Sequence, residues 1–371
     1  MHIPDGYLSP QTCAVATVVM VPVWGTAARK VRETIKRREV PLLALAAAYS
    51  FLVMMLNVPI PDGTTAHAVG AVLIAILLGP WAAVIAVSVA LLIQALFFGD
   101  GGVLSFGANA FNMAFVMPFV GYGVYRLISQ RVPLASGRRV LAAGLGAYAG
   151  LNAAALCAAV EFGIQPDLFA SADGTPLYAP FHLTQTIPAM ALAHLTVAGG
   201  VEAALTAGVI AYLQRANLPV LRINRAARPP AATMPGGGPE LEPAVAGRAS
   251  WKWAAAGIGL LALLTPLGLL ASGGAFGEDA PGELNLGRYG LNAVPEGLNR
   301  YNGFWSHTLL GGYGFGDGQN ATVGYLLSAV VGIVVIVAAV FLIAMLARVL
   351  SRSRAGGSGR PDIPITAGGA S

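Results

Sequence analysis

The chain begins with Met1 and His2, a pair that can bind a metal ion in a way that an internal histidine cannot. The Met1 α-amine, the deprotonated His2 amide nitrogen and Nδ1 of the His2 imidazole can close two fused chelate rings around one ion. Three nitrogens held nearly in a plane favour square-planar or tetragonal ions, so Ni²⁺, Cu²⁺ and Co²⁺ rank above tetrahedral Zn²⁺. The alternative is an N-terminal histidine with no metal. No basic stretch and no small-residue cleavage site mark a signal peptide, so we expect Met1 to be retained.

His67 is the second candidate ligand, and it follows the polar loop 57–66. It begins an apolar run, which places it at or just below a membrane surface. Ionisable groups at that depth are costly and usually functional. A neutral His67 imidazole would supply the fourth nitrogen of a planar site; the alternative is a histidine that caps a helix.

Several polar residues are candidates for supporting these ligands. Asn109 and Asn112 follow the glycine-rich segment 99–107 and lie three residues apart, on one face of a helix. They could hydrogen-bond the metal-binding histidines, with Ser105 and Asp62 as further candidates. The alternative for the two amides is that they satisfy one another between helices.

The remaining histidines fit other roles better. His182 and His194 lie too far apart for one helical turn, and we interpret them as polar contacts between helices. His307 lies near Trp305 in a stretch that interfacial anchoring explains, although a transient metal contact is open to it.

The sequence lacks the motifs of several other function classes. It has no GxxxxGK[ST] loop for ATP, and no HExxH, GxSxG or paired CxxC motif. Glu161 and Glu202 are isolated, so there is no run of intramembrane carboxylates for proton or sodium coupling. These absences disfavour an enzyme, including an intramembrane metallohydrolase, and also a self-powered pump. We expect no prosthetic group.

The composition indicates a polytopic membrane protein of the all-α class. Hydrophobic residues make up 56% of the chain and charged residues 11%, against roughly 25% charged in average globular proteins. Apolar runs predict seven spans followed by two more. The predicted spans are 8–28, 40–57, 66–79, 81–98, 107–126, 139–163 and 185–213, and then 252–271 and 324–347.

The basic residues predict the orientation of these spans. If the N-terminus is outside and 66–98 is a hairpin broken at Gly79-Pro80, then 20 of the 22 Lys and Arg residues lie in the cytoplasm. Only Arg288 and Arg300 remain outside. The net charge of +5 is thus explained by the membrane orientation of the chain and does not indicate a nucleic-acid partner.

The spans divide into two modules joined by a linker. Residues 1–214 form the first, and the Pro/Gly-rich stretch 215–250 predicts a flexible cytosolic linker. Residues 251–350 form a two-span module with an outer loop at 272–323. The tail 351–371 is predicted to be disordered.

Three segments of the first module resemble the CbiM/NikM family. They are Met1-His-Ile-Pro-Asp-Gly-Tyr-Leu-Ser-Pro, His67 after Pro-Asp-Gly-Thr-Thr-Ala, and Gly99-Asp-Gly-Gly with Phe106-Gly-Ala-Asn-Ala-Phe-Asn-Met. Members are substrate-capture (S) components of energy-coupling factor transporters for cobalt and nickel. The resemblance covers about residues 1–215 and implies a seven-helix fold with the N-terminus tucked into the bundle. It also implies Met1, His2 and His67 as ligands.

The second module resembles the CbiN/NikN partner of that family, whose outer loop assists metal loading. Val294-Pro-Glu-Gly-Leu-Asn-Arg is similar to a Pro-Asp-Gly-Leu-Glu motif, with Glu296 for Asp and Asn299 for Glu. The whole chain then resembles an M–N fusion. The family implies a transmembrane coupling (T) component of CbiQ/NikQ type and CbiO/NikO-type ATPases as partners.

We therefore expect a multi-pass S component of the bacterial inner membrane that captures Co²⁺ or Ni²⁺ at the outer face. The C-terminus would be cytoplasmic. The alternative is a secondary metal carrier or channel that works without ATPase partners.

Overall fold

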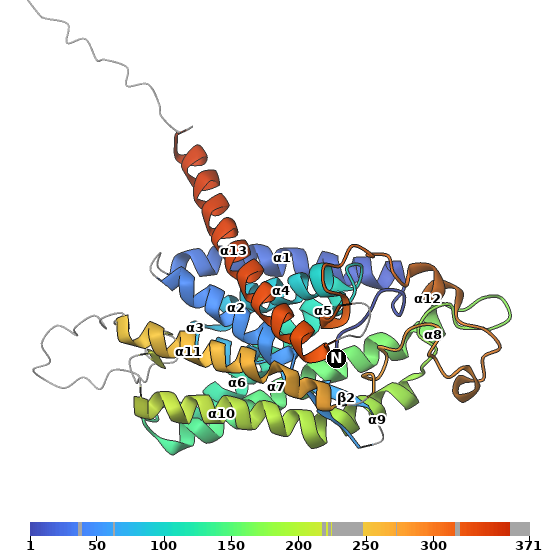
Figure 1. The fold of residues 1–371 in the computed structure, drawn as a ribbon, viewed down its shortest axis with the longest axis horizontal. Helices are drawn as coiled ribbons and strands as arrows, with labels where there is room; N and C mark the ends of the chain where they lie inside the picture. Colours follow the sequence, from blue (N-terminus) through green and yellow to red (C-terminus); the bar gives the residue numbers. More distant parts are fainter. Residues whose placement is uncertain are drawn as a thin grey trace, which may run out of the picture.

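The structure is a predominantly α-helical bundle in which segments far apart in the sequence run side by side (Figure 1). The computed structural model describes residues 1–35, 39–61, 64–216, 220–221, 224, 248–271, 273–315 and 320–356. The helices up to residue 216 are α1 (Pro10–Thr34), α2 (Val40–Met54), α3 (Ala71–Leu78), α4 (Pro80–Ile93), α5 (Phe106–Asn109), α6 (Met117–Ser129), α7 (Gly137–Gly163), α8 (Gln165–Leu168), α9 (Leu183–Ala193) and α10 (Gly199–Ala216). Three π-helical turns interrupt or extend them: η2 (Gln94–Phe98), η3 (Ala110–Val116) and η4 (His194–Ala198).

Six helical stretches of the described residues are long and apolar enough to cross a membrane. They are Pro10–Thr34, Pro80–Phe98, Phe106–Ser129, Gly137–Leu168, Leu183–Ala216 and Ala321–Leu346. Two shorter apolar helical stretches cover Val40–Met54 and Ala255–Leu270. The prediction of an all-α, multi-pass membrane protein is thus confirmed.

The expected hairpin within residues 66–98 is present and turns at Gly79. Gly79 has a φ of 95°, which favours glycine, and Pro80 begins α4. Helix α3 has only eight residues, and those from Ala71 to Ile76 are buried. It is too short to cross a membrane by itself and lies inside the bundle instead.

A small antiparallel hairpin precedes α3. Its strands are β1 (Asn57–Pro59) and β2 (Thr65–His67), and Asn57 lies opposite His67. All three residues of β2 are buried. His67 therefore enters the core on a strand rather than at the surface end of a helix.

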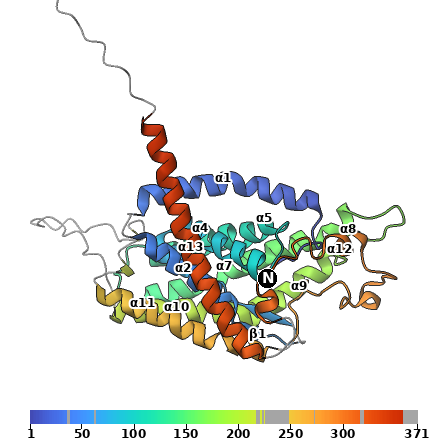
Figure 2. The same cartoon turned by 45° about the horizontal axis from the view of Figure 1, so that its top comes forward.

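The C-terminal segment packs against the first part of the chain. It contains α11 (Arg248–Leu264), α12 (Glu296–Tyr301) and α13 (Ala321–Gly356), with 3-10 turns η7 (Thr265–Leu270), η8 (Leu286–Tyr289) and η9 (Gly311–Tyr313). Helices α11 and α13 both contact α2, and α13 crosses the bundle obliquely (Figure 2). At Gly332, a Cβ would lie 2.2 Å from the Phe51 ring, so α13 approaches α2 closely there.

Part of the predicted linker is anchored to the bundle. Leu221 and Asn224 are buried, and Asn224 Nδ2 donates to the carbonyl oxygens of Ala75 (3.2 Å) and Ile76 (3.1 Å) at the end of α3. Helix α13 continues past Ser351, where the disordered tail was predicted to begin. Residues 225–247 and 357–371 lie outside the described residues.

Candidate metal centre

The N-terminal residues lie inside the bundle, where side chains from the 99–109 segment hold them. Met1, His2 and Ile3 are all at most 5% exposed. The Asp5 carboxylate accepts backbone N–H groups from the loop before α5 at 2.8–3.2 Å. A Cβ on Gly102 would lie 2.0 Å from Asp5 Oδ1, so glycine is needed at this close approach.

The structure brings the three predicted ligand residues together. The Met1 amine lies 3.5 Å from His67 Nε2, and the His2 and His67 rings stack with centroids 4.8 Å apart and planes 27° apart. Two nitrogens that each lie about 2 Å from one ion are separated by roughly 3 to 4 Å. The Met1–His67 pair therefore has a spacing that suits a shared metal ion.

His67 is oriented as metal-binding histidines usually are. Its Nδ1 lies 3.0 Å from the Ala68 carbonyl oxygen, to which it donates, so the Nε2 lone pair faces the Met1 amine. Burial, and secondarily the Met1 ammonium, holds the pKa of His67 well below its usual value. The imidazole is therefore neutral at physiological pH, which is the form that binds metals.

Two carboxylates that the sequence reasoning did not assign contact these ligand residues. Asp100 Oδ1 lies 2.9 Å from His2 Nδ1, and Glu278 Oε1 lies 3.0 Å from the Met1 amine. Burial alone would raise the pKa of Asp100, but the charge and hydrogen bond of His2 bring it below its usual value. Asp100 lies in the Gly99-Asp-Gly-Gly segment that carries the family resemblance, whereas Glu278 lies 277 residues from Met1 in the sequence.

The orientation of His2 differs from that in the predicted chelate. Its Nδ1 faces Asp100, and its Nε2 is buried without a hydrogen-bond partner among the described residues. Only Nδ1 can form a six-membered chelate ring that includes the ion and the His2 amide nitrogen. His2 Nδ1 must therefore break its contact with Asp100 before it can bind the ion.

The candidate supporting residues act mainly on the backbone beside His2. Asn109 binds both backbone groups of Ile3, accepting from its N–H (2.8 Å) and donating to its carbonyl oxygen (3.0 Å), and Ser105 Oγ donates to the same carbonyl. Asn112 instead donates to Glu161 Oε2 at 2.6 Å. The hydrogen bonds found for these three residues in the described part of the chain include none to an imidazole. Asp62 lies outside the described residues.

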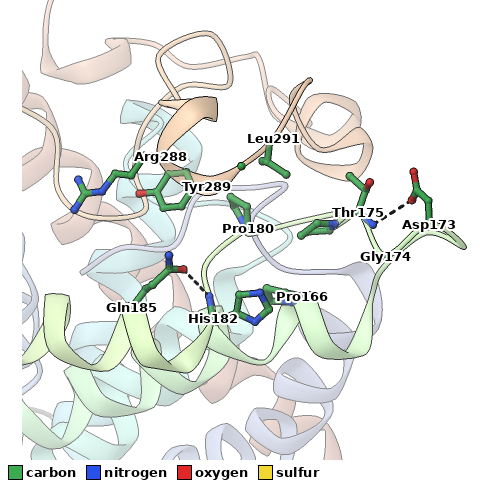
Figure 3. A pocket seen from close by; sticks show the side chains of 12 residues that line it. Pro166, Asp173, Gly174, Thr175, Pro180, His182, Gln185, Arg288, Tyr289 and Leu291 are labelled. Atoms are coloured by element: carbon green, nitrogen blue, oxygen red, sulfur yellow. Dashed lines mark hydrogen bonds between the residues drawn. The ribbon is translucent and has the colours of Figure 1, made fainter.

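His182 lies away from this group, in an open cavity of about 380 Å³ (Figure 3). It is exposed, and its Nδ1 lies 3.3 Å from Asp167 Oδ1. Its backbone N–H donates to Gln185 Oε1, across the first turn of α9. The cavity is also lined by Arg288 and Tyr289 of the C-terminal segment.

Of the two other histidines, His194 lies near the predicted ligands, because it begins η4, which contacts the β2 strand of His67. Its Nε2 is buried without a hydrogen-bond partner among the described residues. His194 is 2% exposed and its Nδ1 lies 2.8 Å from the Met190 carbonyl oxygen, one turn earlier in the same helix. His307 is exposed, and its ring centroid lies 5.5 Å from that of Trp305. The described residues contain no group of three or more His, Cys, Asp or Glu side chains spaced to hold a metal ion.

Known proteins share both the sequence and the fold. Residues 2–219 match the CbiM family, described as the cobalt uptake substrate-specific transmembrane region. The fused nickel transport protein NikMN of Rhodobacter capsulatus is 50% identical over 368 residues, covering 96% of this chain and all of that protein. The probable fused nickel transport protein LarMN of Lactiplantibacillus plantarum is 45% identical, covering 90% and 95% of the two chains.

A crystal structure of a truncated transition metal transporter covers 57% of this chain and 98% of its own, with 58% identity and a TM-score of 0.54. The relatives are transport proteins rather than enzymes, and the metal is their cargo rather than a prosthetic group. The family match covers more than half of the chain, and the fused relatives align over nearly all of it. This chain therefore belongs to the CbiM family of transmembrane metal-uptake components, in its fused form.

Proposed function

We propose that this protein is the substrate-capture component of an energy-coupling factor importer for Ni²⁺ or Co²⁺. The observation that supports the proposal most strongly is that the Met1 amine and the imidazoles of His2 and His67 lie close together and are buried. The bound ion would take the Met1 amine, the His2 amide nitrogen, His2 Nδ1 and His67 Nε2 as four nitrogen ligands. Such a donor set favours square-planar Ni²⁺ and tetragonal ions over tetrahedral Zn²⁺.

We propose Ni²⁺ as the principal cargo. The fused relatives from Rhodobacter capsulatus and Lactiplantibacillus plantarum, which cover 96% and 90% of this chain, are described as a nickel transport protein and a probable nickel transport protein. The planar donor set supports the same choice, because affinity for nitrogen ligands rises from Co²⁺ to Ni²⁺.

The proposed orientation places the N-terminus outside and the C-terminus in the cytoplasm of a bacterial inner membrane. The distribution of Lys and Arg supports it, since 20 of the 22 then lie on the cytoplasmic side. In this arrangement residues 1–214 form the capture module, and residues 251–350 form an auxiliary module whose loop contacts it outside the membrane.

Energy for uptake would come from separate subunits. The sequence contains no nucleotide-binding motif, so a T component and two cytosolic ATPases are the proposed partners. A carrier or channel without these partners would transport metal in vesicles that contain this chain alone. We expect such vesicles to show metal binding but no sustained uptake.

The decisive experiment adds one residue before Met1. The extension turns the Met1 amine into an amide and moves the new amine out of the fully buried position beside Glu278 and His67, so the chelate of the native N-terminus cannot form there. We expect Ni²⁺ binding by the purified protein to be lost, whereas a one-residue extension at the C-terminus leaves it intact. Full binding by the N-terminally extended protein would contradict the proposal.

A second variant tests His67. His67→Ala removes the fourth ligand and should lower Ni²⁺ affinity strongly, while His182→Ala, which removes an exposed imidazole, should not. If the two variants bind Ni²⁺ with equal affinity, His67 is not a ligand and its role is structural.

A further inference from the structure

The loop that joins η7 to α13, residues 273–315, reaches both residues of the N-terminal chelate. Glu278 contacts Met1, and Tyr313 contacts Asp100, which holds His2. We propose that the capture site is composite, with Glu278 and Tyr313 acting as positioning residues: Glu278 holds the Met1 amine, and Tyr313 holds the Asp100 carboxylate that His2 releases to the ion. The inference rests on the proposed function, because it assumes that Met1, His2 and His67 bind the metal.

The contact of Glu278 is an ion pair at a buried end of the chain. The Met1 amine is fully buried, whereas the Glu278 side chain is 24% exposed, and the two atoms lie 3.0 Å apart. A buried ammonium needs a charge partner, and Glu278 is its carboxylate contact. A metal-bound amine keeps two N–H groups, so Glu278 can accept a hydrogen bond before and after the ion binds.

Tyr313 acts one step further from the ion. Its hydroxyl donates to Asp100 Oδ2 at 2.5 Å, while Asp100 Oδ1 lies 2.9 Å from His2 Nδ1. Gln94 Nε2 donates both to the Tyr313 hydroxyl (2.8 Å) and to Asp100 Oδ2 (3.1 Å), which fixes the pair. When the ion takes His2 Nδ1, the Asp100 carboxylate keeps Tyr313 and Gln94 as its hydrogen-bond partners. Tyr313, a residue of the loop 273–315, therefore stabilises Asp100 in the arrangement that binds the metal.

The backbone at Tyr313 supports a positional role. The φ of Tyr313 is 62°, in the left-handed region that residues other than Gly, Asn and Asp seldom adopt. The preceding residue, Gly312, also has a positive φ, of 60°. Such a conformation persists only where the surroundings hold it. Here the ring stacks on Phe98 with centroids 5.1 Å apart, while the hydroxyl reaches Asp100.

Other contacts dock the same loop around the ligand-bearing segments. Ala275 forms a parallel bridge with Thr65 in β2, two residues before His67. The Tyr7 hydroxyl donates to the Asp279 carbonyl oxygen at 2.8 Å, and a Cβ on Gly6 would lie 2.7 Å from the Leu298 carbonyl oxygen. The loop 273–315 thus contacts both segments that supply ligands, the N-terminal residues and β2. Residues 1–216 by themselves contain neither Glu278 nor Tyr313.

The test uses the purified full-length chain with Ni²⁺ as the probe. Glu278→Gln removes the charge and Tyr313→Phe removes the hydroxyl, each with little change of shape. Glu283→Gln and Tyr301→Phe are matched controls in the same loop: Glu283 is exposed, and Tyr301 stacks on Tyr178. Changes to groups that hold metal ligands typically reduce metal affinity 10- to 100-fold.

We expect each of the two test variants to bind Ni²⁺ about 10- to 100-fold more weakly, and the controls to stay within about 2-fold of wild type. The absorption bands of bound Ni²⁺ should keep their wavelengths, because the ligands themselves are unchanged. Thermal unfolding of the metal-free proteins reports whether each variant folds, and Glu278→Asp should recover part of the affinity.

Wild-type affinity in both test variants would overturn the inference, as would shifted Ni²⁺ bands, since these would make Glu278 or Asp100 a ligand. The N-terminal extension separates this result from the proposed function. If the extension abolishes binding while Glu278→Gln and Tyr313→Phe do not, only the composite site is refuted.

Discussion

Asn109 offers a quantitative test of how the N-terminus is held. It is 3% exposed and binds both backbone groups of Ile3, the residue next to His2. In Asn109→Ala, the Ile3 carbonyl keeps its contacts with Gly102 N and Ser105 Oγ, but the Ile3 N–H loses the side-chain oxygen that it binds at 2.8 Å. Leaving one buried donor unpaired costs about 1–3 kcal/mol.

This free energy opposes docking of the N-terminus and hence metal binding, so Ni²⁺ affinity should fall roughly 5- to 150-fold. Competition titration with a chelator measures the affinity, and hydrogen exchange of residues 1–8 measures the docking. Asn299→Ala, at an exposed position of the loop 273–315, is the control. Unchanged affinity in Asn109→Ala, or weakened binding with no increase in N-terminal exchange, would refute the reasoning.

Three further predictions concern the segment around His67. Gly70→Ala should lower both the melting temperature and Ni²⁺ affinity, because Gly70 has a φ of 74° and a Cβ would lie 2.3 Å from the Tyr49 ring. Glu202→Gln should weaken Ni²⁺ binding with the bundle still folded by circular dichroism, because its carboxylate accepts the Val69 and Gly70 N–H groups at 2.7–3.1 Å. Burial lowers the pKa of His67 in the folded protein. As the pH falls through about 6.5, the His67 imidazole is therefore protonated in the unfolded chain but stays neutral in the folded one. Stability should therefore fall as the pH drops below about 6.5, and His67→Gln should flatten this slope in thermal melts.

The apolar runs were sufficient to predict most of the helices. The expected span 139–163 corresponds to α7, and 81–98 corresponds to α4 with η2. Gly79-Pro80 correctly marked the hairpin, because the conformational preferences of glycine and proline act locally. The start of α3 was harder to predict: the expected span began at residue 66, but the structure places 65–67 in β2 and begins the helix at Ala71. Just before the helix, the Gly70 N–H donates to Glu202, a residue 132 positions away in the sequence.

The same limit applies to the candidate site. Met1 and His2 were identified from the chemistry of a free N-terminus, and His67 from its position at the start of an apolar run; the structure brings the three together. The partners Glu278 and Tyr313 could not be identified from the sequence, since their roles depend on where a distant loop docks. Asn109 could be placed near the site, but only the fold shows that it binds the Ile3 backbone rather than an imidazole.

The position of Glu202 gives the His67 segment a mechanical connection across the bundle. Glu202 belongs to α10, which runs on to Ala216, about 21 Å further along the helix axis at 1.5 Å per residue. Because a helix tilts as a rigid rod, a force applied near Ala216 would shift Glu202 and the Val69–Gly70 backbone that it holds. Helix α10 therefore connects Ala216 directly to the backbone that follows His67, although the two are far apart in the sequence.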